Sequence, residues 1–278
     1  MTAARLSEVP RAGAAAQEAA PARAPIEIAG VSQVFRRAGQ VTHALDKVDL
    51  NVAGSEFIAI VGPSGCGKST LLKIIAGLIQ RSSGGVRIDG QEVQGPYTNL
   101  GIVFQSPVLL DWRNVLDNVL VQLELRGIDP RSYRDRALEL LGKVGLGEFR
   151  DRMPRELSGG MRQRAAIVRA LIHEPPLLMM DEPFGALDAL TREQMRIDLE
   201  KLWLHRRQTT LFITHGISEA VALADRVVVM TPRPGRIDRI IPIDLPRPRH
   251  KDVLASRRFT EYCNQITECF MRHGVIRY

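Results

Sequence analysis

The chain has 278 residues, of which 45% are hydrophobic and 25% charged, and its formal net charge is +7. Such a composition is that of an ordinary globular protein with a sizeable buried core. No apolar run approaches the roughly 18 residues that span a bilayer, so we expect a soluble chain or one attached to a membrane through a partner. The three cysteines and six histidines lack metal-site spacing, and the odd cysteine count favours a reducing compartment.

The two ends of the chain differ from the rest in composition. Residues 1–25 are rich in Ala and Pro without an apolar period, so we expect a disordered tail. From Thr231 to the end, ten Arg or Lys stand against five Asp or Glu. A basic segment can contact nucleic acid or anionic lipid, but this one has no long basic block, which favours a solvated surface and no nucleic-acid partner. We expect residues 247–278 to form a basic helical extension.

Short β-like segments separated by turns fill the chain from Ile26 to about Val93. The segments are IEIAGVSQVF, HALDKVDLNV, EFIAIVG and VRIDGQEV, and NLGIVFQ follows as a further strand. Within VRIDGQEV, the pair Asp89-Gly90 is typical of a tight hairpin turn. A helix, KSTLLKIIAGL, is expected between the third and fourth segments. This part of the chain is therefore predicted to be rich in β-structure.

The pattern turns helical between about Pro107 and Arg169, where YRDRALELLGKVGL has apolar residues at helical intervals. Strands and helices then alternate, in the order LLMMDEP, LTREQMRIDLEKLWLHRR, TTLFITH, ISEAVALA and RVVVM. Apolar strands that alternate with helices predict a parallel sheet covered on both faces. We expect PRPGRI and LPRPRH to be turns and a linker, and ASRRFTEYCNQITECFMRHGV to be one last helix.

A phosphate-binding loop is predicted where a strand meets a helix. GPSGCGKS, from Gly62 to Ser69, matches the G-x-x-x-x-G-K-[ST] pattern between the strand FIAIV and the helix KSTLLKIIAGL. Glycines let backbone N–H groups approach phosphate oxygens, and the helix N-terminus adds its positive end. Lys68 supplies a charge to the β- and γ-phosphates, and the Ser69 hydroxyl can bind Mg²⁺. The candidate nucleotide-binding residues are Gly62, Pro63, Ser64, Gly65, Cys66, Gly67, Lys68, Ser69 and Thr70.

Two carboxylates follow the apolar strand in LLMMDEP. Asp181 is expected where that strand leaves the sheet, and it can hold Mg²⁺ through water. Its neighbour Glu182 can polarise an attacking water molecule. Acidic pairs after strands are common, and the phosphate loop is what makes this pair specific.

Residues 157–164, LSGGMRQR, form a second candidate anion site. Ser158 can cap a helix, and Gly159 and Gly160 leave the backbone N–H groups of the first turn accessible. One chain would then contain two phosphate sites, almost a hundred residues apart.

GPSGCGKST, LSGGMRQR and LLMMDEP, in this order, resemble the nucleotide-binding subunit of an ABC transporter. LSGG is the signature that separates this family from other P-loop ATPases. The resemblance runs from about residue 26 to about residue 246 and implies an α/β fold. That fold is a P-loop NTPase (RecA-like) core with a β-rich N-terminal subdomain and an inserted α-helical subdomain at about 107–169. It also implies ATP and Mg²⁺ as ligands and ATP hydrolysis as the activity.

The resemblance assigns roles to further positions. Phe35 matches the aromatic residue that stacks on adenine, and Gln105 in GIVFQS matches the Q-loop glutamine. Asp188 in GALD matches the D-loop, and His215 in FITH matches the switch histidine. The implied catalytic residues are Glu182, His215, Lys68 and Gln105, and the implied metal ligands are Ser69, Gln105 and Asp181.

In the family, the signature contacts ATP held by a second copy of the subunit, so two copies enclose two nucleotides head to tail. The resemblance implies that Ser158, Gly159 and Gly160 meet a γ-phosphate across that interface. It also implies an integral membrane permease as partner and, indirectly, a periplasmic solute-binding protein. The implied location is the cytoplasmic face of the bacterial inner membrane, as a peripheral subunit. Trp112, within the expected helical subdomain, is either a docking residue for the permease or an ordinary core tryptophan.

The short C-terminal tail, LSGGMRQR and IPIDLPRPR are similar to subunits of nitrate, sulfonate and taurine uptake systems. Binding protein and permease select the solute, so these residues do not identify it. The alternative is a soluble ABC ATPase that acts on DNA or ribosomes. Such proteins have long coiled coils or two ATPase units in one chain, and this sequence has neither. A non-hydrolysing binder would lack Lys68 or Glu182, and both are present.

Four positions depart from the family pattern. Met161 replaces the glutamine that commonly follows LSGG, and Gly185 replaces a frequent serine before ALD. Gly216 replaces the common aspartate after the histidine, and Asp111 stands where proline is usual. None of these is a phosphate or metal ligand in the family, so we expect ATP hydrolysis to be retained.

Overall fold

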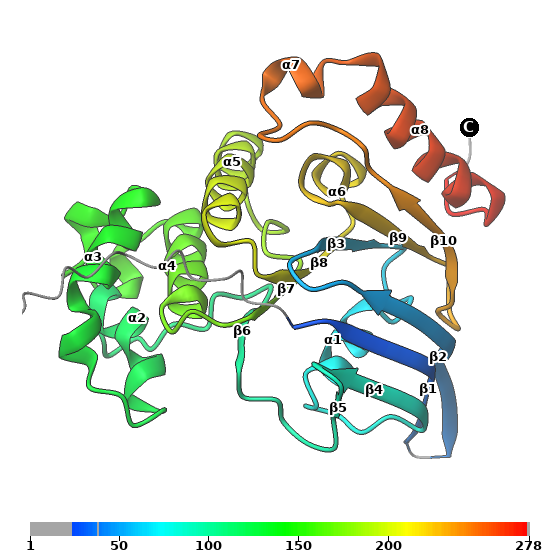
Figure 1. Cartoon of the computed structure of the whole chain (residues 1–278), viewed down its shortest axis with the longest axis horizontal. Helices are drawn as coiled ribbons and strands as arrows, with labels where there is room; N and C mark the ends of the chain where they lie inside the picture. Colours follow the sequence, from blue (N-terminus) through cyan, green and yellow to red (C-terminus); the bar gives the residue numbers. More distant parts are fainter. Residues whose placement is uncertain (1–23, 38, 277–278) are drawn as a thin grey trace, which may run out of the picture.

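The computed structural model describes residues 24–276 with the exception of residue 38. The disordered tail expected over residues 1–25 lies outside the described residues, apart from its last two. Figure 1 shows two β-sheets at one side of the molecule and a lobe of helices at the other. No described helix is long and apolar enough to cross a membrane.

A six-stranded sheet occupies the centre, in the order β10-β9-β3-β8-β7-β6. Five strands are parallel, and β10 pairs antiparallel with β9 at the edge. The strands are β3 (Phe57–Val61), β6 (Leu100–Val103), β7 (Leu177–Asp181), β8 (Thr209–Thr214), β9 (Arg226–Met230) and β10 (Ile237–Pro242). The parallel sheet confirms the prediction. No strand was predicted at β10, because only Ile241 of that strand is buried and it lacks an apolar run.

Both faces of this sheet are covered, since successive side chains of a strand point to opposite sides. In β3, Phe57, Ala59 and Val61 belong to one apolar cluster, and Ile58 and Ile60 to another. The first cluster contains residues of α4, α5 and α6, and the second contains residues of α1 and the smaller sheet. These helices are α1 (Lys68–Ile75), α4 (Gly159–Leu171), α5 (Ala189–Arg206) and α6 (Ile217–Leu223).

The smaller sheet is antiparallel, in the order β2-β1-β4-β5. Its strands are β1 (Ile26–Arg37), β2 (Gln40–Val52), β4 (Ser83–Ile88) and β5 (Gln91–Glu92). The predicted hairpin turn is confirmed between β4 and β5. Asp89 and Gly90 both have positive φ, at 52° and 74°, which is the backbone geometry of the tight two-residue turn.

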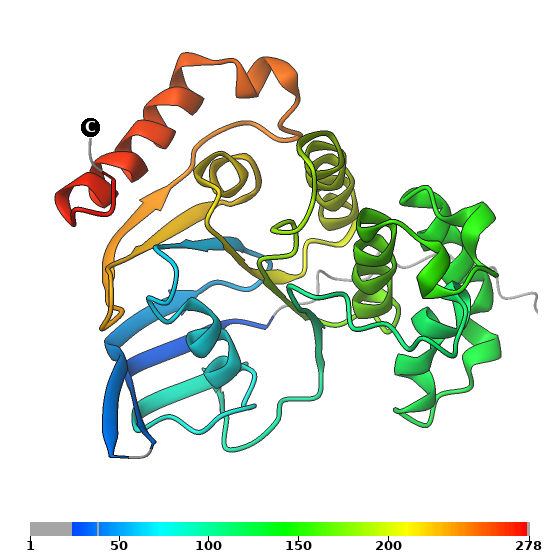
Figure 2. The same cartoon turned by 180° about the vertical axis from the view of Figure 1, so that it is seen from behind.

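The helical lobe has an apolar cluster of its own, which includes Leu116, Leu141 and Val168. Its elements are α2 (Val115–Glu124), α3 (Arg134–Lys143) and the short 3₁₀ turns Pro130–Tyr133, Gly147–Phe149 and Pro154–Glu156. Helix α4 contributes to this cluster and to the cluster of the large sheet. It stands between the lobe and the sheets when the molecule is seen from the front and from behind (Figure 1, Figure 2).

Two helices end the described chain, α7 (Lys251–Leu254) and α8 (Arg257–Arg272). The long helix predicted over 255–275 corresponds to α8, whose first turn is capped by Ser256. Helix α8 packs against α6 (Figure 1) and buries Ile266, Cys269 and Phe270 in the cluster of the large sheet.

Arg249, just before α7, is a basic residue inside the core. It is 1% exposed, and its Nη1 donates hydrogen bonds to the carbonyl oxygens of Val221 (2.6 Å) and Ala224 (2.7 Å), at the end of α6. Its backbone N–H donates to the buried carboxylate of Glu200 at 2.9 Å. The guanidinium thus binds carbonyls that the last turn of a helix leaves without a partner.

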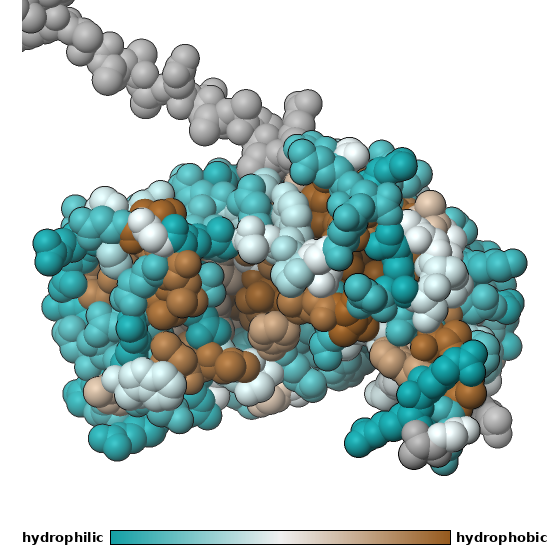
Figure 3. All heavy atoms as spheres, turned by 90° about the horizontal axis from the view of Figure 1, so that it is seen from below, coloured by the Kyte–Doolittle hydropathy of each residue, from teal (hydrophilic) through white to brown (hydrophobic). Residues whose placement is uncertain are grey.

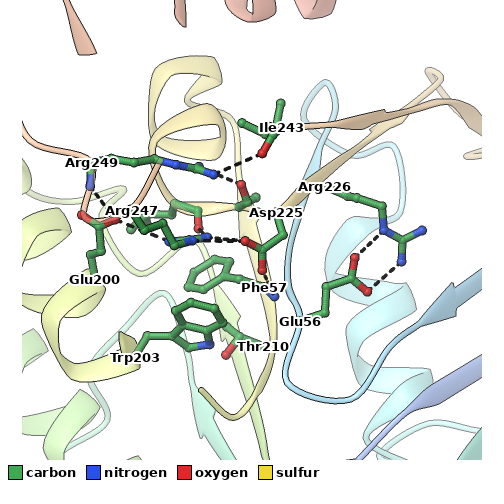
Figure 4. Close-up of polar contacts among 12 residues, drawn as sticks. Glu56, Phe57, Glu200, Trp203, Thr210, Asp225, Arg226, Ile243, Arg247 and Arg249 are labelled. Carbon is green, nitrogen blue, oxygen red and sulfur yellow. Dashed lines mark hydrogen bonds and ion pairs between the residues drawn. The ribbon is translucent and has the colours of Figure 1, made fainter. Parts of the chain in front are cut away.

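Arg247 also anchors the segment before α7, through contacts with Asp225 and Trp203 (Figure 4). Its Nη2 lies 2.8 Å from the Asp225 carboxylate, and its guanidinium carbon lies 4.6 Å from the centre of the Trp203 ring. A solvated surface was expected for the basic C-terminal segment, and at these two arginines that expectation is wrong. The Arg249 guanidinium is buried and that of Arg247 is mostly buried, because backbone carbonyls, carboxylates and an aromatic face interact with them.

Arg249→Ala is expected to lower the free energy of unfolding by about 2–4 kcal/mol, because it leaves buried carbonyl groups without donors. Arg257→Ala is the matched control, since that side chain lies at the surface of α8 and is expected to leave stability unchanged. Urea unfolding followed by circular dichroism measures both. Equal midpoints for the two variants would contradict this role of Arg249.

Candidate functional site

The predicted phosphate loop lies between β3 and α1. Gly67, the N-cap of α1, has a φ of 110°, and no side chain caps this helix. A Cβ atom at Gly67 would lie 2.7 Å from Leu45 Cδ2 and 2.8 Å from the carbonyl oxygen of Ala44. Glycine is needed here both for the backbone angle and for the close approach of β2. The N–H groups of the first turn of α1 therefore stay available for an anion.

Lys68 is 4% exposed and points back into the loop. Its Nζ donates hydrogen bonds to the carbonyl oxygens of Gly62 (2.8 Å) and Pro63 (3.1 Å). Cys66 is buried as well, and burial raises the pKa of its thiol. Only Lys68 therefore brings a charged side chain to the loop, and the Cys66 backbone N–H donates to the carbonyl oxygen of Pro63 at 3.3 Å.

Asp181 ends β7 beside the first turn of α1. The Ser69 hydroxyl donates a hydrogen bond to Asp181 Oδ1 at 2.8 Å. Burial raises the pKa of the Asp181 carboxyl, the hydrogen bond from Ser69 opposes this, and the charge of Glu182 adds to the rise. A nearby cation would favour the ionised carboxylate. Hydroxyl and carboxylate oxygens are the donors that a hard divalent cation takes.

The Glu182 carboxylate is the point where the other predicted residues meet. Its Oε2 lies 3.4 Å from His215 Nδ1 and 3.5 Å from Gln105 Nε2, and its Oε1 lies 3.9 Å from Lys68 Nζ. These partners follow three other parallel strands, β8, β6 and β3, whose carboxyl ends share one edge of the sheet. Glu182 has a φ of 47°, which is rare for a residue with a side chain.

Phe35 reaches the same site from the smaller sheet. It is 41% exposed, so it is not a core residue, and it lines one pocket together with the phosphate loop and Glu182. The other residues that line this pocket are Thr42, Ala44, Ser64, Gly65, Gly67, Lys68, Ser69, Thr70 and Arg233. An exposed aromatic ring beside a phosphate loop can stack on a nucleobase.

Arg233, which no sequence pattern indicated, contacts the phosphate loop. Its Nε and Nη2 donate hydrogen bonds to the carbonyl oxygen of Gly65, at 3.1 Å and 2.9 Å. The loop that contains it packs tightly, because a Cβ atom at Gly235 would lie 2.0 Å from the carbonyl oxygen of Cys66. PRPGRI indicated a turn, and nothing in it pointed to a loop 168 residues earlier.

The signature residues Ser158, Gly159 and Gly160 do not line the pocket of the phosphate loop. Ser158 caps α4 as predicted, and its Oγ accepts a hydrogen bond from the N–H of Met161 at 3.3 Å. Gly159 is open to its surroundings, but a Cβ atom at Gly160 would lie 2.4 Å from Thr191 Cγ2 in α5. Packing within the chain therefore also requires Gly160. The pocket of the phosphate loop has no lining residue from α4 among the described residues.

Two of the departures from the family pattern have visible causes. A Cβ atom at Gly216 would lie 2.8 Å from the carboxyl carbon of Glu219, so this acid occupies the place of a side chain at 216. The Glu219 carboxylate accepts a hydrogen bond from the Thr214 hydroxyl at 2.5 Å. Met161 packs against the apolar cluster of the helical lobe. Nothing in the structure explains Gly185 or Asp111.

An apolar groove lies apart from the pocket of the phosphate loop. Seen from below, hydrophobic side chains gather in a hollow between the helical lobe and the sheets (Figure 3). A groove lined by the end of α1, β6 and α2 includes Leu78, Ile102, Phe104 and Leu125. Trp112 is 74% exposed, which excludes the core tryptophan that the sequence left open.

Comparison with known proteins agrees with this geometry. The family described as ABC transporter matches residues 45–185, just over half of the chain. The chain belongs to this family. It is an ATP-binding cassette that hydrolyses ATP, and the predicted family and fold class are confirmed.

Several known proteins are similar to this chain over most of its length. An uncharacterised ABC transporter ATP-binding protein of Methanocaldococcus jannaschii is 46% identical, with 87% of this chain and 89% of that protein covered. The taurine import ATP-binding protein TauB of Rhizobium johnstonii is 49% identical, with 76% and 80% covered. The aliphatic sulfonates import ATP-binding protein SsuB of Bacillus cereus is 39% identical, with 91% and 98% covered.

A solved structure has the same fold. The ATP-binding cassette MJ0796, as a dimer in a post-hydrolysis state bound to ADP and Pi, superposes with a TM-score of 0.70. The two chains are 32% identical, with 78% of this chain and 98% of that chain covered.

Arg233→Ala is expected to weaken ATP binding about three- to tenfold, the effect of losing roughly 1 kcal/mol, the net contribution of a typical hydrogen bond. The lost contacts hold the phosphate loop at Gly65. Arg236→Ala, in the same loop, is the control, because Arg236 pairs with Asp46 and not with the phosphate loop. Titration with a fluorescent ATP analogue measures both. An unchanged dissociation constant for Arg233→Ala would contradict the prediction.

Proposed function

We propose that this chain is the ATP-hydrolysing subunit of an ABC importer for a small solute such as nitrate, an aliphatic sulfonate, taurine or a related compound. The observation that carries the ATPase role is the meeting of Lys68, Gln105 and His215 at Glu182. Relatives named for taurine and sulfonate import support the importer role. The proposed ATPase domain spans residues 26–246, with the helical subdomain at about 107–169 and the extension at 247–278.

The nucleotide would lie along the phosphate loop, with adenine on Phe35 and the phosphates at the N-terminus of α1. Lys68 would turn from the carbonyl oxygens of Gly62 and Pro63 toward the β- and γ-phosphates. Ser69, Asp181 and Gln105 would hold Mg²⁺, which suits their oxygen donors and supplies charge neutralisation at the phosphates.

Hydrolysis would use the group around Glu182. The Glu182 carboxylate accepts a hydrogen bond from the attacking water and orients it in line with the γ-phosphate. His215, 3.4 Å away, holds that carboxylate and reaches toward the γ-phosphate. Lys68 stabilises the negative charge that develops on the phosphate oxygens.

We further propose that two copies assemble head to tail, so that Ser158, Gly159 and Gly160 of one copy contact the γ-phosphate held by the other. Two observations support this. The pocket of the phosphate loop receives no described residue of α4, and the similar cassette MJ0796 is a dimer. Each nucleotide would then lie between two chains. ATP binding would close the pair, and hydrolysis would allow it to reopen.

The membrane partner would dock on the groove between α1, β6 and α2, near the helical lobe. An exposed apolar groove on a protein of this kind is typical of a partner site. Trp112, exposed in the helical region, offers an aromatic anchor of the sort that interfaces favour. The partners would be an integral permease and, through it, a periplasmic solute-binding protein. The subunit would work at the cytoplasmic face of the bacterial inner membrane.

Glu182→Gln is expected to lower kcat for ATP hydrolysis by about 100-fold or more, because the amide cannot accept the proton of water. ATP binding should persist, and an ATP-bound dimer should accumulate. A phosphate-release assay and size-exclusion chromatography with ATP measure the two effects, with Glu193→Gln on α5 as control. A monomeric variant with full activity would overturn the role of Glu182.

Ser158→Arg is expected to leave ATP binding unchanged and to abolish hydrolysis, since the large side chain would block the approach of the opposite phosphate. Ser256→Arg is the matched control, because Ser256 also caps a helix, α8, with the same loss of about 1 kcal/mol. Nucleotide titration measures ATP binding by both variants, and phosphate release measures their hydrolysis. Weak ATP binding by Ser158→Arg alone would count against a site in trans.

Deletion of the subunit in its source organism tests the importer role. We expect loss of growth on nitrate, taurine or an alkanesulfonate as sole nitrogen or sulfur source, restored by the wild type and not by Glu182→Gln. Co-purification with an integral membrane protein would separate this function from the alternative, a soluble ATPase. Salt-sensitive binding of the lone subunit to DNA or ribosomes, without a membrane partner, would favour the alternative.

A further inference from the structure

A second pocket lies away from the nucleotide site, between the helical lobe and α5. It is a cavity of 290 Å³, and it shares no lining residue with the phosphate-loop pocket or the apolar groove. On α3, Arg136, Leu140 and Lys143 are spaced at i, i+4 and i+7 and so line it as one face. On α5, residues 198, 201, 202 and 205 do the same.

The cavity has an apolar floor and a basic rim. Apolar surface comes from Leu140 of α3, Leu171 of α4 and Leu202 of α5. Pro175, in the segment between α4 and β7, adds to it. The basic side chains of the lining are Arg136, Lys143, Lys201 and Arg206, against the acids Glu174 and Asp198. Lys143 pairs with Glu139 at 2.6 Å, outside the lining, and the remaining charges still leave the lining net positive, which favours an anion.

Both acids of the lining are already engaged. One carboxylate oxygen of Glu174 pairs with Arg136 of α3, and the other pairs with Arg206 of α5. Asp198 accepts a hydrogen bond from Gln194 Nε2 at 2.8 Å. Asp198 keeps its negative charge, and Lys201, which is exposed at the rim, has no ion-pair partner within 4 Å among the described residues. Glu174 also joins the helical lobe to α5 across the cavity.

Two buried polar atoms of the lining lack partners among residues 24–276. Gln208 is 2% exposed, and its side-chain oxygen has no hydrogen-bond partner there. The Nε of Arg136 is buried and unpartnered too. Buried polar groups are normally hydrogen-bonded. The Arg136 Nε–H can therefore donate to an anionic ligand, whereas the Gln208 oxygen is an acceptor and would need a donor such as water. Pockets with mostly apolar walls and a few convergent polar groups are typical ligand sites.

We propose that this cavity binds a small amphipathic organic anion, with its apolar body on the leucines and its carboxylate or sulfonate at the rim near Lys201. The bound molecule would contact α3 and α5 at once. It would thereby stabilise the contact between the helical lobe and α5, the helix whose N-cap is Asp188. This inference does not depend on which solute the importer carries.

Matched ligands test the proposal on the full chain saturated with ADP, so that the phosphate loop is occupied. Isothermal titration calorimetry would compare 1-hexanesulfonate, 1-hexanol and hexylammonium, which share a chain and differ in charge. We expect saturable binding of hexanesulfonate, and binding at least roughly tenfold weaker for the other two. 1-Butanesulfonate, shorter by two CH₂ groups, should bind roughly tenfold more weakly than hexanesulfonate. Hexanesulfonate should also raise the melting temperature.

Lys201→Glu is expected to weaken hexanesulfonate binding roughly tenfold or more, because the charge at the rim is reversed. Lys251→Glu, on the exposed face of α7, is the control and should bind as the wild type does. Absence of saturable binding, equal binding of the three head groups, or equal binding by the two variants would each overturn the proposal. The ligand comparison needs no variant, so it decides the question even if Lys201→Glu folds poorly.

Discussion

The nucleotide site depends on where β7 ends. Glu182 follows this strand in a left-handed backbone conformation, and its carboxylate lies within 4 Å of the functional atoms of Lys68, Gln105 and His215. Those residues are up to 147 positions apart in the chain, and they meet because β3, β6, β7 and β8 are parallel and aligned in register. The carboxyl ends of all four strands then lie at one edge. A different strand order would separate the four side chains.

Packing by two elements keeps the phosphate loop in shape. Strand β2 approaches so closely that only glycine fits at Gly67. The loop after β9, which is hydrogen-bonded to β2, places Gly235 against Cys66 and the Arg233 guanidinium against Gly65. Lys68 completes the arrangement from inside, through the loop carbonyls. The loop is therefore held by elements that belong to two different sheets, which keeps its N–H groups directed at one point.

Local patterns explain why some predictions succeeded. Asp89-Gly90 predicted its hairpin because the turn needs positive φ at two adjacent residues, and short-range sterics alone impose this. The apolar strands were recognisable since both of their sides are buried. Strand β10 and Arg233 escaped prediction for the opposite reason. One is an edge strand with a single buried residue, and the contact of the other is with a distant loop.

By itself, the sequence determined the family, the phosphate loop, the acidic pair and the class of fold, because each depends on residue types at fixed short spacings. Only the tertiary structure decided that Trp112 lies at the surface, that Gly160 is needed for packing on Thr191 and that Arg249 is buried in the core. These are outcomes of contacts between segments far apart in the chain. Such contacts follow from how the helices and sheets pack together, which no local pattern records.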